Sequence, residues 1–274
     1  MKGTEKLVDR KPAARTEREN APRTVEVVCG SSGCRAAVES QGVAVMVDAL
    51  RASATITSLM AAGARRVWVA TEVEQAHVMK ERIGDVFLVG EREGFPPPGF
   101  DVGNSPRGVM DLSLKGRDVV FTSTTGAARL GQLEGTALAL VGSPVNASLV
   151  AQVAAERAGD RPIFSISAGL RGSPGGTEED WIGAALIAER LTDHGFEWIN
   201  HGLGVDGYWP YLLDGPSVRQ GFLDGTSGQL LGDKGLAPDI EDCAAIDWID
   251  AVAAVVGYLK IDDGPPVAEL ERIA

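Results

Sequence analysis

The stretch Val43-Ala44-Val45-Met46-Val47-Asp48 decides the fold class of this chain. Its unbroken apolar run, rich in Val, predicts a strand that is buried on both faces. An Ala-rich helix from Ala52 to Gly63 follows almost directly, with Gly63 in a C-cap role. A buried strand that leads into a helix is the repeating unit of a parallel sheet, so this stretch predicts an α/β architecture.

The same alternation of strand and helix continues along most of the chain. Runs of β-branched residues predict further strands over residues 24–29, 66–70, 86–89, 118–122, 136–141 and 162–167. Capped or Ala-rich segments predict helices over residues 71–83, 124–133, 146–158, 178–194 and 248–260. Thr71 is the expected N-cap of its helix, with Glu74 completing a capping box. These elements predict a mostly parallel sheet with helices on both faces, in three layers.

The two ends of the chain differ from this pattern. Residues 1–22 carry six basic and four acidic side chains with almost no apolar periodicity, which predicts a flexible polar tail. Residues 23–274 are expected to form the α/β domain, and a division into two lobes near residues 141–146 stays open. Residues 202–235 are rich in Gly and Asp, and Gly204-Val205-Asp206-Gly207 and Asp224-Gly225-Thr226-Ser227-Gly228 are turn signals within them.

Composition and charge exclude several classes of protein. The chain has 26 Lys and Arg against 38 Asp and Glu, a net charge of −12, which repels nucleic-acid phosphates and anionic lipids. Three Cys and three His are too few for a disulfide scaffold or a His-rich metal site. Cys29 and Cys34 could form a redox pair, but burial is the favoured interpretation. Without a membrane-length apolar stretch or a signal core, a soluble cytoplasmic protein is expected, and homo-oligomer formation stays open.

Candidate site residues follow the carboxyl ends of the predicted strands, where open parallel sheets bind ligands. The strand 43–48 delivers Asp48, and Arg51 and Ser53 follow at the start of a helix. A carboxylate suits a hard cation, and a helix N-terminus suits an anion. The alternative is structural, with Asp48 as an N-cap and Arg51 as its surface partner.

The next strand end carries the charged loop Gly90-Glu91-Arg92-Glu93-Gly94. Glu91 could join Asp48 on a cation, while Arg92 could grip a phosphoryl or sulfonate oxygen. An exposed charged loop without a ligand is the alternative.

Two further polar segments follow along the chain. Ser105 before Pro106 is typical of an N-cap, whereas Asn104 and Asp101 have no such structural role. The run Thr122-Ser123-Thr124-Thr125-Gly126 precedes a predicted helix and resembles a phosphate cradle of hydroxyl and N–H donors. It lacks the Gly-Lys-Ser/Thr ending of a P-loop, so a plain hydroxyl-rich N-cap is equally consistent with it.

A fourth strand end, after residue 167, leads to Arg171 and to the acids that open the next helix. Glu179 is interpreted as an ordinary partner of the helix dipole, whereas Glu178 and Asp180 could face the same site.

These strand ends together indicate an anionic ligand held with a divalent cation. Mg²⁺ is the expected cofactor, with Asp48 and Glu91 as its carboxylates and Asp101 in reserve. Asp48, Glu91 and Arg51 are the expected catalytic residues. The expected phosphate- and substrate-binding residues are Ser53, Arg92, Asn104, Ser105, Ser123, Thr124, Thr125, Gly126 and Arg171.

The reaction expected of such a site is hydrolysis of a phosphate monoester on a small, acid-bearing alcohol. Water attack aided by a carboxylate and covalent attack by Asp48 both stay open. A protein that binds such an anion without turnover is the alternative from another class, and the two carboxylates at separate strand ends count against it.

The order of these motifs resembles the 2-phosphosulfolactate phosphatase family. The resemblance covers roughly Val43 to Asp247, and Gly99-Phe100-Asp101-Val102-Gly103-Asn104-Ser105-Pro106 is its most specific part. Other matching pieces are Val47-Asp48-Ala49-Leu50-Arg51-Ala52-Ser53, Gly90-Glu91-Arg92, Thr122-Ser123-Thr124-Thr125-Gly126, residues 142–147, Ser167-Ala168-Gly169 with Glu179-Asp180, and Asp239-Ile240.

The resemblance implies a magnesium-dependent α/β phosphatase. It would convert 2-phosphosulfolactate to 3-sulfolactate in coenzyme M biosynthesis. Two departures concern Glu93, where the family commonly carries Gly, and Thr125-Gly126-Ala127, where it commonly carries Asn-Gly-Thr. Another small phosphorylated hydroxy acid therefore stays an alternative substrate.

Overall fold

The computed structural model describes residues 22–170, 172, 175–199 and 213–274. Ten strands in these residues form one sheet. In their order across the sheet they are β4 (Val86–Gly90), β5 (Asp118–Thr122), β3 (Arg66–Ala70), β10 (Val267–Arg272), β9 (Ala253–Leu259), β6 (Leu138–Val141), β2 (Val43–Val47), β7 (Ile163–Ser167), β1 (Thr24–Cys29) and β8 (Glu197–Ile199).

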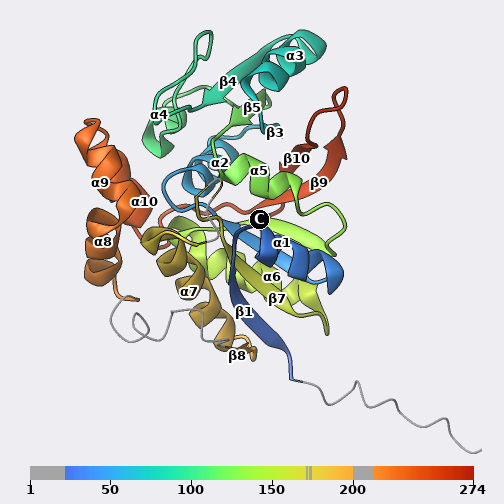
Figure 1. The fold of residues 1–274 in the computed structure, drawn as a ribbon, viewed down its shortest axis with the longest axis vertical. Helices are drawn as coiled ribbons and strands as arrows, with labels where there is room; N and C mark the ends of the chain where they lie inside the picture. Colours follow the sequence, from blue (N-terminus) through green and yellow to red (C-terminus); the bar gives the residue numbers. More distant parts are fainter. Residues whose placement is uncertain (1–21, 171, 173–174, 200–212) are drawn as a thin grey trace, which may run out of the picture.

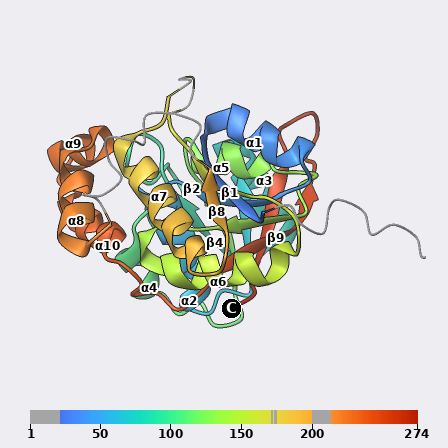
Figure 2. The same ribbon diagram turned by 90° about the horizontal axis from the view of Figure 1, so that it is seen from below.

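Helices cover both sides of this sheet. They are α1 (Gly30–Glu39), α2 (Ala52–Ala61), α3 (Val73–Ile83), α4 (Pro106–Met110), α5 (Gly126–Gly131), α6 (Ala147–Ala158), α7 (Glu178–Thr192), α8 (Gly215–Asp224), α9 (Thr226–Asp233) and α10 (Ala237–Ala244). Figure 2 shows α1 and α5 on one side of the sheet and α2 and α6 on the other. The expected fold class, a mostly parallel sheet covered by helices on both faces, is confirmed.

The sheet consists of two parallel sets joined by an antiparallel hairpin. β4, β5 and β3 form one set, and β6, β2, β7, β1 and β8 form the other. The hairpin β9–β10 pairs antiparallel with β6 on one side and with β3 on the other. Figure 1 shows the two sets at opposite ends of the molecule with α2, α5 and the hairpin between them.

The two parallel sets run in opposite directions, because three successive antiparallel pairings separate β6 from β3. Neighbouring strands rotate by roughly 20 to 25° relative to each other. β2 lies six places from β4 in the strand order. The accumulated twist is therefore roughly 120 to 150°. A rotation of this size offsets the reversal and lets the carboxyl ends of both sets face one site.

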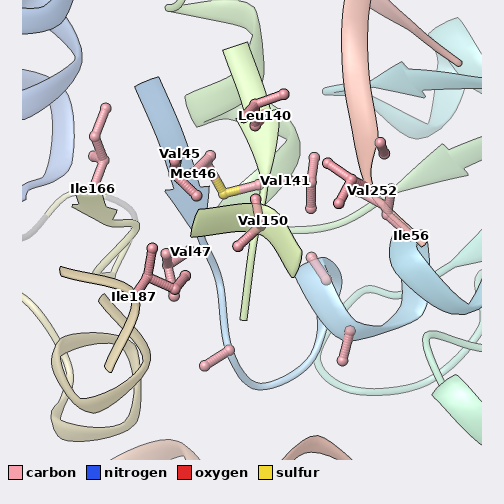
Figure 3. Packing of buried hydrophobic residues seen from close by; sticks show 14 of the residues in the cluster. Val45, Met46, Val47, Ile56, Leu140, Val141, Val150, Ile166, Ile187 and Val252 are labelled. Atoms are coloured by element: carbon pink, nitrogen blue, oxygen red, sulfur yellow. The ribbon is translucent and has the colours of Figure 1, made fainter. Parts of the chain in front are cut away.

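The core is centred on β2, whose five residues are all buried. Met46 pairs with Val141 of β6 on one side and with Ile166 of β7 on the other. Figure 3 shows these side chains packed with residues of α2, α6 and α7, among them Ile56 and Val150. The continuous apolar run of this strand is explained by its position between two strands and two helical layers.

One element prediction is wrong, and a Gly-rich stretch is more helical than its composition suggests. Residues 253–259 of the predicted C-terminal helix form β9, where Val256 is half-exposed and the first two residues are buried. The segment pairs with strands on both sides, so sheet formation outweighs its Ala-rich composition. Within the Gly- and Asp-rich stretch, Gly215–Asp224 and Thr226–Asp233 form α8 and α9, which meet at Gly225 of the second turn signal. Asp214 caps α8 by accepting a hydrogen bond from the Ser217 N–H at 2.8 Å.

The capping box of α3 is also displaced by one residue. Glu72 is the N-cap, its backbone N–H donates to Gln75 Oε1 at 3.2 Å, and the reciprocal bond is present as well. Thr71, the predicted cap, instead has a buried hydroxyl without a hydrogen-bond partner. The remaining predicted strands and helices are present, several with ends shifted by one or two residues.

The N-terminal tail, the lobe boundary and the oligomeric state remain to be considered. Residues 1–21 of the predicted tail are outside the described residues. The lobe boundary near residues 141–146 and homo-oligomer formation stay predictions. In the part of the chain that the structure describes, no helix combines the length and the apolar character needed to cross a bilayer.

Candidate active site

A cavity of about 210 Å³ lies where the carboxyl ends of β2, β4, β5 and β7 approach one another. Its walls come from these strand ends, from the start of α7 and from one face of α9. The charged residues that line it are Asp48, Glu91, Glu93, Glu179, Asp180, Arg51 and Lys234. Acidic side chains therefore outnumber basic ones in the cavity wall.

Asp48 stands at the end of β2 with its carboxylate buried in this cavity. The carboxylate accepts hydrogen bonds from the backbone N–H groups of Ala52, at 3.4 Å, and Gly126. A side chain at Gly126 would place its Cβ 2.7 Å from Asp48 Oδ2, so only glycine allows this approach. Burial, followed by the charge of Glu91, raises the pKa of Asp48 to about 6.

Glu91 follows β4 and is held by three donors. Its Oε1 accepts from the Thr124 N–H at 2.7 Å and from the Thr124 hydroxyl at 2.9 Å, while Oε2 accepts from the Gly94 N–H at 2.9 Å. A carboxylate offers about four acceptor positions, so Glu91 retains capacity for a cation.

The hydroxyl-rich turn after β5 thus differs from the predicted phosphate cradle. Its Thr124 and Gly126 donors are directed to the two carboxylates, and the Ser123 hydroxyl accepts from the Ala127 N–H at 3.1 Å. Ser123, Thr124 and Thr125 all line the cavity. The turn therefore orients the acidic groups of the site.

Arg51 is buried in the cavity wall. It forms a 2.5 Å ion pair with Asp239 of α10, and it also donates to the Gly94 carbonyl at 2.7 Å. Asp239 in turn accepts from the Ser105 hydroxyl at 2.6 Å. The structural alternative in which Arg51 pairs with Asp48 is wrong, because Asp239 holds the guanidinium.

Two polar residues near the site have mainly positioning contacts. Ser53 accepts from the Asp48 N–H at 2.9 Å, which fixes the end of β2. Ser105 is the predicted N-cap of α4 and accepts from the Gly108 N–H at 3.2 Å. Asn104, by contrast, lines the cavity, and its buried Oδ1 has no hydrogen-bond partner.

Besides Ser53, Ser105 and Gly126, two predicted residues, Asp101 and Arg92, do not line the cavity. Asp101 accepts from the Leu88 N–H at 2.7 Å and its side chain is 40% exposed. Arg92 donates to the carbonyls of Glu91 and Thr71 and to the Thr122 hydroxyl, so it supports the strand ends from outside. Arg171 lies outside the described residues.

Among the acids that open α7, Asp180 lines the cavity as the sequence suggested, whereas Glu179 was undervalued. Glu179, interpreted as a plain helix-dipole partner, is buried in the cavity wall, and its Oε2 has no hydrogen-bond partner. A Cβ at Gly225 would lie 2.6 Å from that oxygen, so the start of α9 closes over Glu179. No sequence signal separates such a residue from the acids that commonly begin a helix.

Asp180 joins two loops at the site. Its oxygens accept from the Ala49 N–H at 2.7 Å and from the Gly169 N–H at 2.9 Å. Burial, then the charges of Asp48 and Glu179, raise the pKa of Asp180 well above its ordinary value. Asp180 thereby couples the end of β7 to the end of β2.

The donor set is suited to one hard cation. Among the residues that the structure describes, no three His, Cys, Asp or Glu side chains are grouped as a metal cluster. Magnesium needs only one or two protein carboxylates, because waters and substrate phosphate complete its coordination. The pair Asp48 and Glu91, with the unpartnered Glu179 oxygen beside it, has the negative charge that such an ion would offset.

Comparison with known proteins agrees with this site. The family described as 2-phosphosulpholactate phosphatase matches residues 32–257. A protein of Deinococcus radiodurans named "Probable 2-phosphosulfolactate phosphatase" is 37% identical over 85% of this chain and 93% of its own length. Proteins of the same name from Carboxydothermus hydrogenoformans and Thermus thermophilus are both 31% identical, over 84% and 78% of this chain and 91% and 88% of their own lengths. This chain therefore belongs to the 2-phosphosulpholactate phosphatase family.

Proposed function

We propose that this chain hydrolyses 2-phosphosulfolactate to 3-sulfolactate and phosphate with the help of Mg²⁺. Family membership and the names of the relatives support the reaction class. The proposal of Mg²⁺ rests on one observation. Two carboxylates, Asp48 and Glu91, are buried at the ends of two strands in one cavity.

The charge of the cavity supports a cation as part of this site. Five acidic side chains line the wall, and Arg51 is already paired with Asp239. A phosphate dianion that entered this wall alone would be repelled at short range in a medium of low dielectric constant. When bound, the ion would offset that charge and polarise the phosphoryl oxygens.

The chain's own residues would position the reacting groups. Asp48 and Glu91 would hold the ion, and their backbone and hydroxyl donors keep both carboxylates in place. Thr125 and Asn104 line the cavity and would contact the phosphoryl oxygens. In the reaction, a bond forms between phosphorus and a water oxygen. The bond from phosphorus to the C2 oxygen breaks, and that oxygen takes up a proton.

We also infer a cytoplasmic location. The described cysteines Cys29, Cys34 and Cys243 are free and buried, which suits a reducing compartment. Measurement of the chain in cytoplasmic and envelope fractions of its host tests this assignment, and recovery in the envelope fraction would overturn it.

Phosphate release from synthetic 2-phosphosulfolactate tests the proposed reaction. We expect turnover with Mg²⁺ and its loss in EDTA, with recovery when Mg²⁺ is restored. Asp48→Asn and Glu91→Gln should each lower kcat by at least about 100-fold, the scale of one lost electrostatic contact to the transition state. Asp160→Asn, on an exposed turn before β7, is the matched control and should retain activity. Undiminished turnover in EDTA, or in both site variants, would refute the proposal.

A further inference from the structure

One face of α9 forms a wall of the cavity. Ser227, Leu230, Leu231 and Lys234 all line it, and their spacing of three, four and seven residues is that of one helical face. Figure 1 shows α9 beside α8 and α10, in a group at one side of the sheet. The chain thus brings a helix from near its C-terminal end against strand ends that lie far earlier in the sequence.

Lys234 is the charged residue on this face. Its Nζ donates to the carbonyl oxygen of Glu93, in the loop after β4, at 2.6 Å. An ammonium group has three donors and this neutral carbonyl uses one of them. Among the described residues, no carboxylate lies within ion-pair distance of Lys234.

Among the described residues, the other positive side chains near the cavity already have partners. Arg51 is paired with Asp239 and also donates to Gly94. Arg92 donates to Thr71 and Thr122 from outside the cavity. Within the described cavity wall, Lys234 is therefore the positive side chain without an ion-pair partner.

We propose that Lys234 binds the acid group that the substrate carries besides its phosphate. This inference rests on the proposed phosphatase function and names the feature that sets substrate choice. The phosphoryl group would lie at the Asp48 and Glu91 end, and Lys234 would exchange the Glu93 carbonyl for a sulfonate or carboxylate oxygen. A charge-assisted hydrogen bond to an oxyanion is stronger than one to a neutral carbonyl, which favours the exchange.

The substrate class follows from this arrangement. It comprises small phosphate monoesters that carry a second oxyanion close to the esterified carbon. The side chains of Leu230 and Leu231 on α9, near Lys234, offer no hydrogen-bond donors to a neutral polar group. Simple alkyl phosphates would reach the same carboxylate end but would gain nothing from Lys234.

The test uses three substrates and two variants of the whole chain. The substrates are 2-phosphosulfolactate, 2-phospholactate, which lacks the sulfonate, and isopropyl phosphate, which lacks both acids. The variants are Lys234→Met and the control Lys115→Met. Lys115 is exposed and lies before β5, at the end of that strand away from the cavity.

We expect Lys234→Met to lower kcat/KM for 2-phosphosulfolactate by about 10- to 100-fold, the scale of one charge-assisted bond. Isopropyl phosphate should be turned over by this variant and by the unaltered chain at the same rate. Loss on 2-phosphosulfolactate alone assigns the sulfonate as the partner of Lys234, and an equal loss on 2-phospholactate assigns the carboxylate. Lys115→Met should leave all three rates unchanged, and Lys234→Arg should restore part of the loss.

Two results would overturn the inference while leaving the proposed function intact. One is an equal loss by Lys234→Met on all three substrates, which would place Lys234 at the phosphoryl group or in the fold. The other is no loss on any of them. If the unaltered chain releases phosphate from none of the three substrates, the proposed function itself fails, and this inference fails with it.

Discussion

Single residues in this site act mainly by holding carboxylates in place. Glu91 takes donors from Thr124 and Gly94, while Asp180 takes donors from Ala49 and Gly169. Each bond satisfies an acid that burial would otherwise penalise. The polar residues at the strand ends therefore donate mainly to the buried acids, and fewer of their groups are left for the substrate.

Asp239 provides a test at this scale. It is buried and joins Arg51 to Ser105, so its removal leaves the Arg51 charge buried with only a carbonyl partner. We expect Asp239→Ala to lower the free energy of unfolding by about 3 to 5 kcal/mol. The double variant Arg51→Met with Asp239→Leu should recover most of that stability, because both buried charges are gone.

Urea unfolding of the two variants provides the measurement. A cost below about 1 kcal/mol for Asp239→Ala would mean that the ion pair is solvated, since exposed pairs contribute only that much.

Strand-end reasoning predicted Asp48, Glu91 and Arg51 because their positions depend on where a strand stops, whereas Asn104 was predicted from the polar segment before α4. Glu179, Asp239 and Lys234 could not be predicted in the same way. Each lies on a helix or, for Lys234, at the end of one, and its position depends on packing with segments that are distant in sequence. For Arg92 the loop was predicted correctly, but the direction of the side chain was not.

At the scale of elements, the hairpin β9–β10 determines how the two parallel sets are joined. Its residues 253–259 form an apolar run that periodicity cannot assign to helix or strand without knowledge of their neighbours. The strands of the parallel sets were easier to predict, because β-branched runs bounded by turn residues have few alternatives.

Leu270 of β10 tests the importance of this hairpin. Its side chain is fully buried and its backbone pairs with both β3 and β9. We expect Leu270→Ala to lower the free energy of unfolding by about 2 to 5 kcal/mol, the usual cost of a large cavity in a core. Val256→Ala on the half-exposed face of β9 is the control and should cost less than about 1 kcal/mol. Equal costs in chemical denaturation would contradict the described register.

At the scale of the whole molecule, the accumulated twist of the sheet creates the site, because it offsets the reversal between the two parallel sets. The sequence does not show that strand directions change across the sheet. A strand and the helix that follows it have the same sequence pattern whichever way the strand runs in the sheet. The twist that brings Glu91 to Asp48 accumulates over many strands and belongs to the sheet as a whole.

Buried thiols give the molecule a predictable dependence of stability on pH. Burial raises the pKa of Cys34 to about 11 and that of Cys243 well above its usual range. Unfolded thiols titrate near about 8.5, so above this pH the unfolded chain loses protons that the folded chain retains. The free energy of unfolding should then fall as pH rises toward 11, by up to about 1.4 kcal/mol per pH unit for each thiol.

Urea unfolding at pH 8, 9 and 10 measures this slope, and Cys34→Ala should make it shallower by removing one of the thiols. An unchanged slope in that variant would show that Cys34 does not contribute.

The central claim is that Asp48 and Glu91 share one magnesium ion, and calorimetric titration of Mg²⁺ into the whole chain tests it most directly. We predict one ion per chain, with affinity lowered at least about 10-fold, or about 1.4 kcal/mol, by Asp48→Asn or Glu91→Gln. The double variant should bind more weakly than either single variant, because it removes both protein carboxylates of the ion. Asp101→Asn should leave binding unchanged, since that carboxylate accepts from Leu88 outside the cavity. Binding of equal strength in the unaltered chain and in both single variants would contradict the claim.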